Sequence, residues 1–433
     1  MYQNIYVRNL IVRYFFKLLL LLVLFFYFYP VEFTFLPILP GRIIQIIGFA
    51  FFLYDLFRQK SISKFLLQFY RYGILIFIIG IITTVLINGT NEFAPALRGV
   101  YMFLYSFAGY LIMKLMLKTT KHFTYYTLIE WMIFITIVQA IISFAFFFSP
   151  NLLAAYNDIT VLDDIEKFNI ENIIGFRLMG VGNVQYATAA VQYGVILWGL
   201  ILLKKQKPNS FYSSPIIYNF VICLFCAAGI LSGRTFFLIL IVTFGYIFYL
   251  NGKDNIAISI KSVLSICGLL IILFAIVVGY LLVDRPEAIE WIFELFINLE
   301  KHGSLDSGST THLQTMYIFP DNIQTWLIGD GRIAGDERGF YKNTDVGYIR
   351  SLFYWGIIGS LIYFIVQYKC FKILKKCIDD MFVCKYMLFI LVLYYIYNLK
   401  DFWYIAQFYT LFLMAALFIM RLEYTRKCSL SYY

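Results

Sequence analysis

The chain has 433 residues, of which 61% are hydrophobic and 14% are charged, and its mean hydropathy is +0.78. Soluble domains carry about 25% charged residues, so this composition excludes a soluble globular protein. The formal net charge is +10. Apolar runs close to the length of about 20 residues that crosses hydrocarbon recur along the chain, which predicts an all-α polytopic membrane protein.

We expect about twelve transmembrane helices. Residues 1–282 would hold nine of them, with an acidic loop near residues 149–180. Residues 283–345 would form one large loop between the ninth and tenth helices, and residues 346–433 would hold the last three helices and a tail. The helix centres are expected near Phe25, Ile47, Ile79, Phe107, Ile137, Gln192, Cys223, Val242, Leu270, Ile358, Leu391 and Leu413.

The charge distribution predicts the orientation. With the N-terminus in the cytoplasm, most of the 35 Lys and Arg residues lie inside and most of the 25 acidic residues lie outside, as the positive-inside rule requires. Both termini would then be cytoplasmic, and the large loop would lie on the outer side. The basic balance is a topology signal, and we expect no nucleic-acid partner.

Arginine outnumbers lysine on the predicted outer side, whereas lysine predominates inside. The guanidinium group recognises phosphate or carboxylate through two parallel hydrogen bonds, whereas lysine acts as a point charge. The outer set therefore favours an anion-binding role, although each arginine could instead pair with an outer acid. Its members are Arg42, Arg98, Arg177, Arg234, Arg285, Arg332, Arg338 and Arg350.

The first candidate element opens the sixth predicted helix. It runs from Arg177 to Ala187 and reads R-L-M-G-V-G-N-V-Q-Y-A. Gly180 would let another backbone or a ligand approach closely. Asn183 is a polar group that enters the membrane and needs a partner there. The alternative is a plain helix entry with a snorkelling arginine.

The second candidate element is the hairpin tip Ser232-Gly233-Arg234 between two short apolar runs. Each run has 16 residues, which reach about 24 Å as a helix, whereas hydrocarbon is about 30 Å thick. We therefore expect the tip to lie below the membrane surface. Burial of Arg234 there calls for an anionic partner, either a ligand or an outer glutamate.

The third candidate element is the large loop. Residues 284–299 have the spacing of an amphipathic surface helix, and His312 follows a Gly/Ser/Thr-rich stretch. Asp345 immediately precedes the tenth helix. Arg350 lies within that helix, where it should face the bundle interior. The three histidines lack metal-ligand spacing, so we expect no metal site.

These elements, in this order, resemble the O-antigen polymerase (Wzy-type) branch of the O-antigen ligase/polymerase superfamily. The resemblance rests on the residues of the first element, on the Ser232-Gly233-Arg234 tip, on the G-x-G element Gly329-Asp330-Gly331, and on the re-entry at Asp345-Val-Gly-Tyr348. It covers residues 175–365. The family's Asn-Pro is Asn183-Val184 here. The histidine typical of the ligase branch is replaced by Asp345, which favours a polymerase.

The resemblance implies a GT-C-like fold and an inverting glycosyltransferase that uses no nucleotide sugar, cofactor or metal. It also implies a bacterial inner membrane, with the large loop and the active site facing the periplasm. A glycan would move from undecaprenyl pyrophosphate onto the non-reducing end of a lipid-linked repeat unit, with a chain-length regulator as a further partner. Arg177, Arg234, Arg98 and Arg350 would bind pyrophosphate, Arg234 would also be catalytic, and Asp345, or else His312, would be the base. Glycan contacts would come from Asn183, Arg332, Arg338 and Tyr348.

Two other functions remain open at this point. An O-antigen ligase would differ only in its acceptor. A lipid-linked oligosaccharide flippase would be expected to show repeated halves and interrupted helices with polar groups at mid-membrane. Here the polar groups gather at one predicted face, which favours the transferase.

Overall fold

A computed structural model of the full chain describes residues 2–120, 122–161, 177–182, 184–254, 279, 290, 293–294, 297–301, 303, 308–335 and 339–430. In this part of the chain the regular structure is helical throughout, apart from two isolated β-bridges. Nine of the described helices are long and apolar enough to cross a membrane. The chain is therefore an all-α, multi-pass membrane protein, as its composition predicts.

Eleven of the twelve expected spans coincide with described helices. Nine are the long helices, and two are the shorter apolar stretches Thr235–Tyr246 and Met381–Tyr397. The twelfth, expected near Leu270, lies outside the described residues, as does most of the expected amphipathic helix at 284–299. Of that helix, residues 290, 293–294 and 297–299 are described, and they are helical.

The chain folds into two compact units, each of which is built from more than one stretch of the sequence. Unit 1 comprises Met1–Phe28, Pro40–Thr127 and Leu313–Tyr433, and unit 2 comprises Tyr29–Leu39 and Leu128–His312. The N-terminal helices therefore pack with the C-terminal ones, whereas the middle of the chain forms its own unit.

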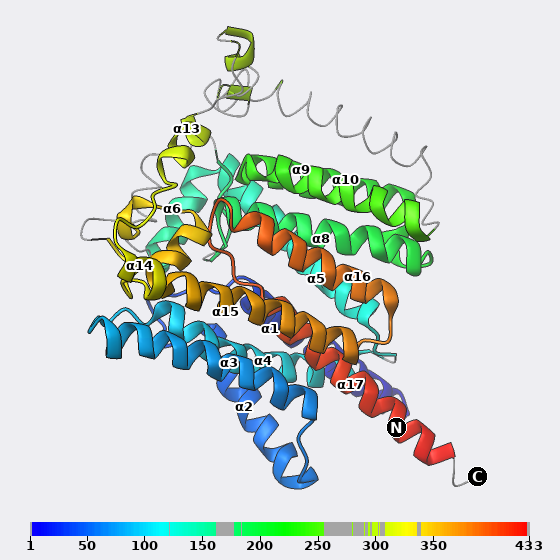
Figure 1. Cartoon of the computed structure of the whole chain (residues 1–433). Coiled ribbons are helices and arrows are strands. Elements are labelled where there is room, and N and C mark those ends of the chain that lie inside the picture. Colours follow the sequence, from blue (N-terminus) through cyan, green and yellow to red (C-terminus); the bar gives the residue numbers. More distant parts are fainter. Residues whose placement is uncertain are drawn as a thin grey trace. The chain divides into compact units, whose positions relative to one another are not determined.

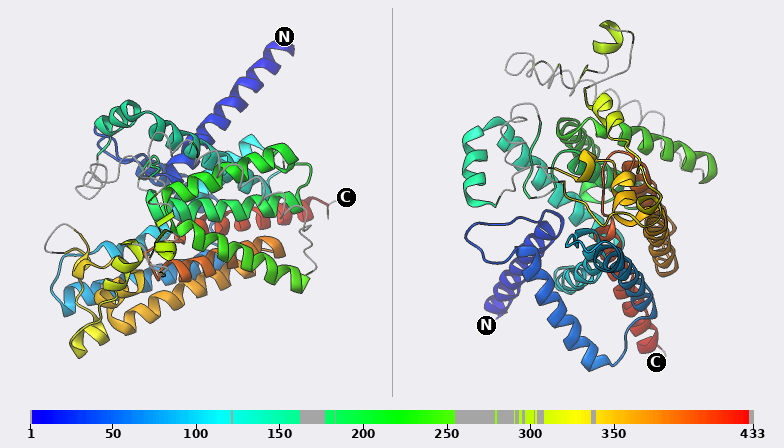
Figure 2. Two further views of the ribbon diagram at one scale, coloured as in Figure 1. Left: turned by 90° about the horizontal axis from the view of Figure 1, so that it is seen from above. Right: turned by 60° about the vertical axis from the view of Figure 1, so that its left-hand side comes forward.

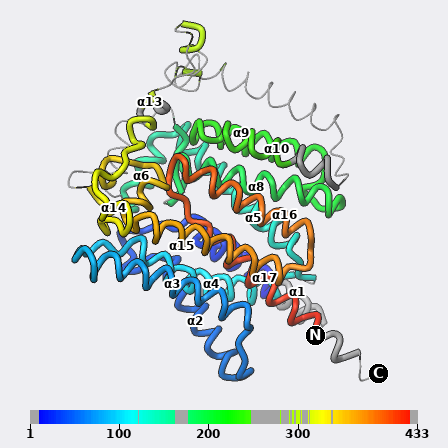
Figure 3. Tube along the Cα trace, in the orientation of Figure 1, coloured from blue at the N-terminus to red at the C-terminus, as the bar shows by residue number. Residues whose placement is uncertain are grey.

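In unit 1, helix α4 (Ala94–Thr119) is the central element, and α1 (Tyr2–Phe28), α2 (Pro40–Gln59), α3 (Lys64–Ile81) and α17 (Ala406–Leu430) all pack against it. Helix α15 (Gly347–Cys377) lies along α3 and also contacts α16 (Met381–Tyr397) and α17 (Figures 1 and 3). The short helices of this unit are α14 (Ile323–Ile328), a 3₁₀ turn at Tyr341–Asn343 and a π-helical turn at Ile82–Ile87.

In unit 2, helix α8 (Tyr186–Gln206) packs against α9 (Pro215–Ser232) and α10 (Thr235–Asp254). Proline is found in the first turn of α9, where its missing N–H has no intrahelical partner to lose. The remaining helices of the unit are α5 (Tyr125–Phe148), α6 (Pro150–Ile159) and α13 (Gly308–Thr315), with a 3₁₀ turn at Phe211–Ser213. The first three residues of α5 and the last three of α13 belong to unit 1.

Helix α15 is broken at Gly356, which has φ +65° and ψ −174°. The break frees the carbonyls of Phe353 and Tyr354, because their helical donors would lie beyond it. The backbone N–H groups of Asp330 and Gly331 donate to these carbonyls, over 2.6 and 3.2 Å. The G-x-G element thus supplies the hydrogen-bond donors that these carbonyls lose at the helix break.

Close backbone approach explains the glycines at this junction. A Cβ on Gly356 would overlap the backbone of α14, and a Cβ on Gly329 would lie 2.5 Å from the carbonyl oxygen of Tyr354. Both glycines also have positive φ, which other residues rarely adopt.

The loop between α3 and α4 also forms hydrogen bonds with the G-x-G turn. Asn88 donates to the carbonyl of Gly329 over 3.1 Å, and the Thr90 hydroxyl donates to that of Gly331 over 2.8 Å. One carboxylate oxygen of Glu92 accepts from the backbone N–H groups of Ile333 and Ala334. The segment before α15 is therefore fixed by hydrogen bonds at both edges.

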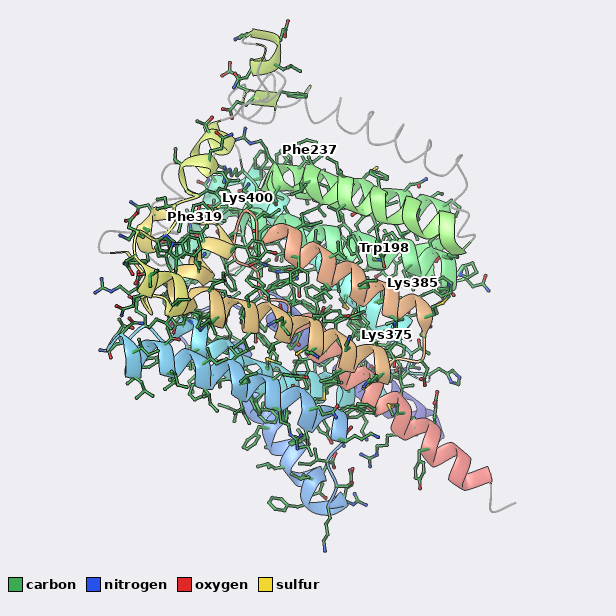
Figure 4. All side chains as sticks on the ribbon, viewed as in Figure 1. Trp198, Phe237, Phe319, Lys375, Lys385 and Lys400 are labelled. Carbon is green, nitrogen blue, oxygen red and sulfur yellow. The ribbon has the colours of Figure 1, made fainter. Side chains whose placement is uncertain are left out.

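The two ends of unit 1 differ in charge and chemistry. Lys375 and Lys385 lie at one end, and Phe319 and Lys400 lie at the other (Figure 4). The first end carries the lysine cluster that the charge distribution predicts to be cytoplasmic. The second carries the G-x-G turn and the start of α15, and it holds the site described below.

We predict that Gly356→Ala destabilises the protein by about 1–3 kcal/mol or more, because a positive φ is costly for alanine and its Cβ meets backbone rather than a movable side chain. Thermal unfolding in detergent measures the effect. The control is Gly245→Ala, since Gly245 lies in α10 with open space at its Cβ position, and alanine there should be neutral or stabilising. Equal midpoints for the two variants would contradict this role of the break.

Candidate functional site

Arg350 lies one turn into α15 and is only 9% exposed, which confirms that it faces the interior. Its guanidinium stacks on the ring of Phe340, with Cζ 3.5 Å from the ring centroid. Nη1 donates to a carboxylate oxygen of Asp401 over 3.4 Å, a long distance for a charge-assisted bond. The buried charge therefore has one long hydrogen bond to a carboxylate, and it lies against the face of an aromatic ring.

Arg98 projects from the first turns of α4 toward the same place. Its Cζ lies 3.4 Å from the ring centroid of Phe402, and the Cζ of Arg350 lies 5.9 Å from that centroid. Two guanidinium groups thus share one aromatic ring, close enough to repel each other electrostatically. Cation–π contacts contribute about 0.5–2 kcal/mol each, and they help to hold the two like charges together.

The loop between α16 and α17 supplies the shared ring and the carboxylate. Gly347 makes the close packing possible, because a Cβ there would lie 2.8 Å from the carbonyl oxygen of Asp401. The Tyr397 hydroxyl and the backbone N–H of Phe402 donate to the Asp401 carboxylate over 3.1 and 2.6 Å. Asp401 is therefore held in place by three donors.

Several buried donors at this site have no acceptor. Among the described residues, Nη1 of Arg98 and Nε of Arg350 lack a hydrogen-bond partner, and so does the Trp355 indole nitrogen. Buried polar groups are normally paired, and an unpaired one costs about 1–3 kcal/mol. Two guanidiniums with one carboxylate and open donors form a site that an anion with several oxygens would complete.

Asp345 lies at the rim of this site. It is exposed and lies two residues before the start of α15. Its carboxylate attracts the Arg350 guanidinium. Glu92 and Asp330 are engaged elsewhere: Glu92 accepts two backbone N–H groups, and Asp330 accepts from the hydroxyls of Thr325 and Tyr341. Asp345 is thus the exposed carboxylate nearest to the arginine pair in sequence.

The other predicted residues of unit 1 are placed as follows. The Tyr348 hydroxyl donates to the carbonyl of Tyr395 over 2.8 Å, so it serves packing in this structure. Arg332 is exposed beside the G-x-G turn. Arg338 lies outside the described residues.

Unit 2 holds the second arginine pair. The backbone N–H of Leu178 donates to the carbonyl of Leu231 over 2.9 Å, which ties the Arg177 segment to the end of α9. Gly180 fits tightly against Gln139 of α5, where no Cβ could be accommodated without a shift. Burial lowers the pKa of the Arg177 guanidinium, and the positive charge of Arg234 lowers it further. Asn183 lies outside the described residues.

Arg234 is 9% exposed at the hairpin tip and forms an ion pair with Glu294. A glutamate partner was one of the two alternatives expected for this arginine. The other Glu294 oxygen accepts from the backbone N–H of Gly308 over 2.5 Å. Burial raises the pKa of the Glu294 carboxyl, but the hydrogen bonds from Gly308 and Arg234 outweigh burial and lower it overall.

The four expected pyrophosphate ligands therefore form two pairs, Arg98–Arg350 in unit 1 and Arg177–Arg234 in unit 2. His312 lies in α13 of unit 2, and only its backbone is described. Sequence reasoning missed Asp401, Phe402 and Phe340. The signal available was the short outer stretch Asn398-Leu-Lys-Asp-Phe-Trp-Tyr404, which places one acid among aromatic residues.

No protein-family model, curated protein or solved structure matches the chain.

We predict that the Glu294–Arg234 ion pair stabilises the protein at neutral pH and is lost in acid. Because the folded pKa lies below the ordinary Glu value, the stabilisation is complete above pH 4.5 and is lost as the pH falls through the folded pKa. Thermal midpoints of the wild type and Glu294→Gln should differ at pH 7 and converge in acid. A difference that stays constant down to pH 3 would contradict the pairing.

Proposed function

We propose that the chain is a lipid-linked glycan polymerase, an inverting glycosyltransferase that moves a growing glycan from undecaprenyl pyrophosphate onto the non-reducing end of a lipid-linked repeat unit. The observation that carries the proposal is the Arg98–Arg350 pair on the ring of Phe402, with one distant carboxylate and open donors. A diphosphate has the negative charge and the oxygens that such a pair requires.

The proposed step is a single displacement at the anomeric carbon of the donor glycan. The acceptor hydroxyl oxygen forms a bond to that carbon, and the bond from the carbon to the pyrophosphate oxygen breaks. The electron pair leaves with the pyrophosphate, and the hydroxyl proton passes to a carboxylate. Arg98 and Arg350 would stabilise the charge that develops on the leaving group, and burial strengthens this effect.

Asp345 is the best candidate for the base. It is exposed at the start of α15, near enough to Arg350 for its charge to act on the guanidinium. Asp401 fits this role less well, because its side chain is only partly exposed and it is the carboxylate that pairs with Arg350. His312 is the second candidate.

The number of arginine pairs supports a polymerase over a ligase. In polymerisation both the donor and the acceptor carry a pyrophosphate, whereas a ligase transfers a glycan from one pyrophosphate-linked donor to an acceptor of another kind. Arg177 and Arg234 would hold the second pyrophosphate, which would displace Glu294 from Arg234. Arg332, Arg338, Asn183 and Tyr348 would contact the glycans.

Deletion of the gene, followed by separation of the lipopolysaccharide on a gel, tests the function. A polymerase predicts core capped with a single repeat, a ligase predicts bare core, and an unchanged ladder would contradict both. Complementation with Arg98→Gln, Arg350→Gln or Arg234→Gln should restore the protein to the membrane but not the ladder. Each variant removes one guanidinium group from a proposed pyrophosphate site.

The matched control for these variants is Lys64→Gln, which removes an exposed positive charge at the far end of unit 1. It should restore a full ladder. A full ladder from Arg350→Gln would contradict the proposed role of the Arg98–Arg350 pair in catalysis.

For the base, we predict that Asp345→Asn lowers the polymerisation rate about 10²–10⁴-fold, the usual contribution of a positioned acid or base. His312→Ala should have a smaller effect. Asp321→Asn is the control, because Asp321 is another exposed acid of the same segment. The assay is chain growth by purified enzyme on lipid-linked repeat units, and a larger loss in His312→Ala would transfer the role to that residue.

A further inference from the structure

Unit 1 contains a large apolar groove far along the bundle from the arginine pair. It has a volume of about 680 Å³ and is lined by α1, α2 and the second half of α4. Its floor is formed by the buried residues Val23, Ile44, Leu111 and Leu115. Its rims are formed by exposed apolar residues, among them Leu22, Ile43, Ile47 and Phe51.

The groove exists because α1 and α2 both pack on α4 but separate from each other. Gly48 brings α2 into contact with the backbone of α4 at Phe107, where no Cβ would fit. Beyond this contact α1 and α2 diverge toward the end of unit 1 that carries the N-terminus (Figure 2). An open apolar trough between two membrane helices remains.

One end of the groove is basic. Arg58, Lys114 and Lys118 line it there, with Asp55 as the acid among its lining residues. Asp55 is engaged by Lys114 and by the Tyr110 hydroxyl. Among the described residues, Arg58 and Lys118 have no ion-pair partner, and both are exposed.

We propose that this groove binds an anionic membrane phospholipid, with its acyl chains against the apolar walls and its phosphodiester between Arg58 and Lys118. The charges lie at the end that the lysine-rich loops predict to be cytoplasmic, so the lipid would belong to the inner leaflet. Basic pockets between transmembrane helices on this side are suited to such head groups. The proposal is independent of the polymerase function.

Charge complementarity favours this occupant over a zwitterionic lipid or a second copy of the chain. Arg58 and Lys118, whose charges are not paired with the acid of the groove, would repel the ammonium of a zwitterionic lipid, and they would attract a phosphodiester of net charge −1. The opposite end of the groove, at Pro40 and Ile43 of α2, carries no charged lining residue. The groove thus has the polarity of one lipid molecule, with one charged end and one apolar end.

The test is native mass spectrometry of the full-length protein in detergent, with equal amounts of phosphatidylglycerol and phosphatidylcholine of the same acyl chains. We expect the wild type to retain phosphatidylglycerol about tenfold more, since each basic residue near a lipid head group adds to the attraction. Arg58→Gln/Lys118→Gln should lose this preference. Ile47→Trp, which fills the groove without changing its charge, should reduce retention of phosphatidylglycerol.

The matched control is Lys60→Gln/Lys64→Gln, which removes two exposed positive charges from the loop after α2 without altering a groove residue. This double variant should keep the preference for phosphatidylglycerol. Equal retention of the two lipids by the wild type would overturn the proposal, and so would an equal loss in both double variants. Displacement of phosphatidylglycerol by an equal amount of undecaprenyl phosphate would assign the groove to the carrier lipid instead.

Discussion

The hydrogen bonds between the G-x-G turn and the broken helix α15 are the interaction on which the described site depends. A membrane helix cannot leave carbonyls unpaired at low cost, because lipid offers no donor. The amides of Asp330 and Gly331 pair with the two carbonyls freed at Gly356. This junction holds the segment before α15 against the loop after α3, and it places Phe340 over Arg350.

A second constraint is the cost of buried positive charge. Arg350 is nearly inaccessible, its hydrogen bond to the Asp401 carboxylate is long, and Arg98 adds a second charge beside it. Aromatic rings and Asp401 offset part of this cost, yet donors remain open. Structural arginines normally have their hydrogen bonds completed. The incomplete pairing is therefore the strongest argument for an anionic ligand. Arg234 differs, because it forms a close ion pair with Glu294.

Parts of the site could be predicted because they depend on local chemistry. An arginine one turn inside an apolar helix must face protein rather than lipid, so the burial of Arg350 followed from its position. The glycines of the G-x-G turn indicated a backbone conformation with positive φ, which the structure has at Gly329 and Gly331. By contrast, Asp401 and Phe402 lie in a short loop with no motif of its own. The contact of Phe402 with Arg98 joins segments about 300 residues apart, which no local pattern encodes.

Composition and hydrophobic run length by themselves determined the membrane class, the helices and the basic end of the molecule, because each depends on the transfer of residues from water to lipid. Only the tertiary structure decided that the arginines form two pairs, that the first and last helices share a unit, and that α2 separates from α1. Helices that are apolar on every side, such as α5 and α8, carry no signal of which face meets which neighbour. That choice is made by packing, through close contacts such as that of Gly48 with the backbone of α4.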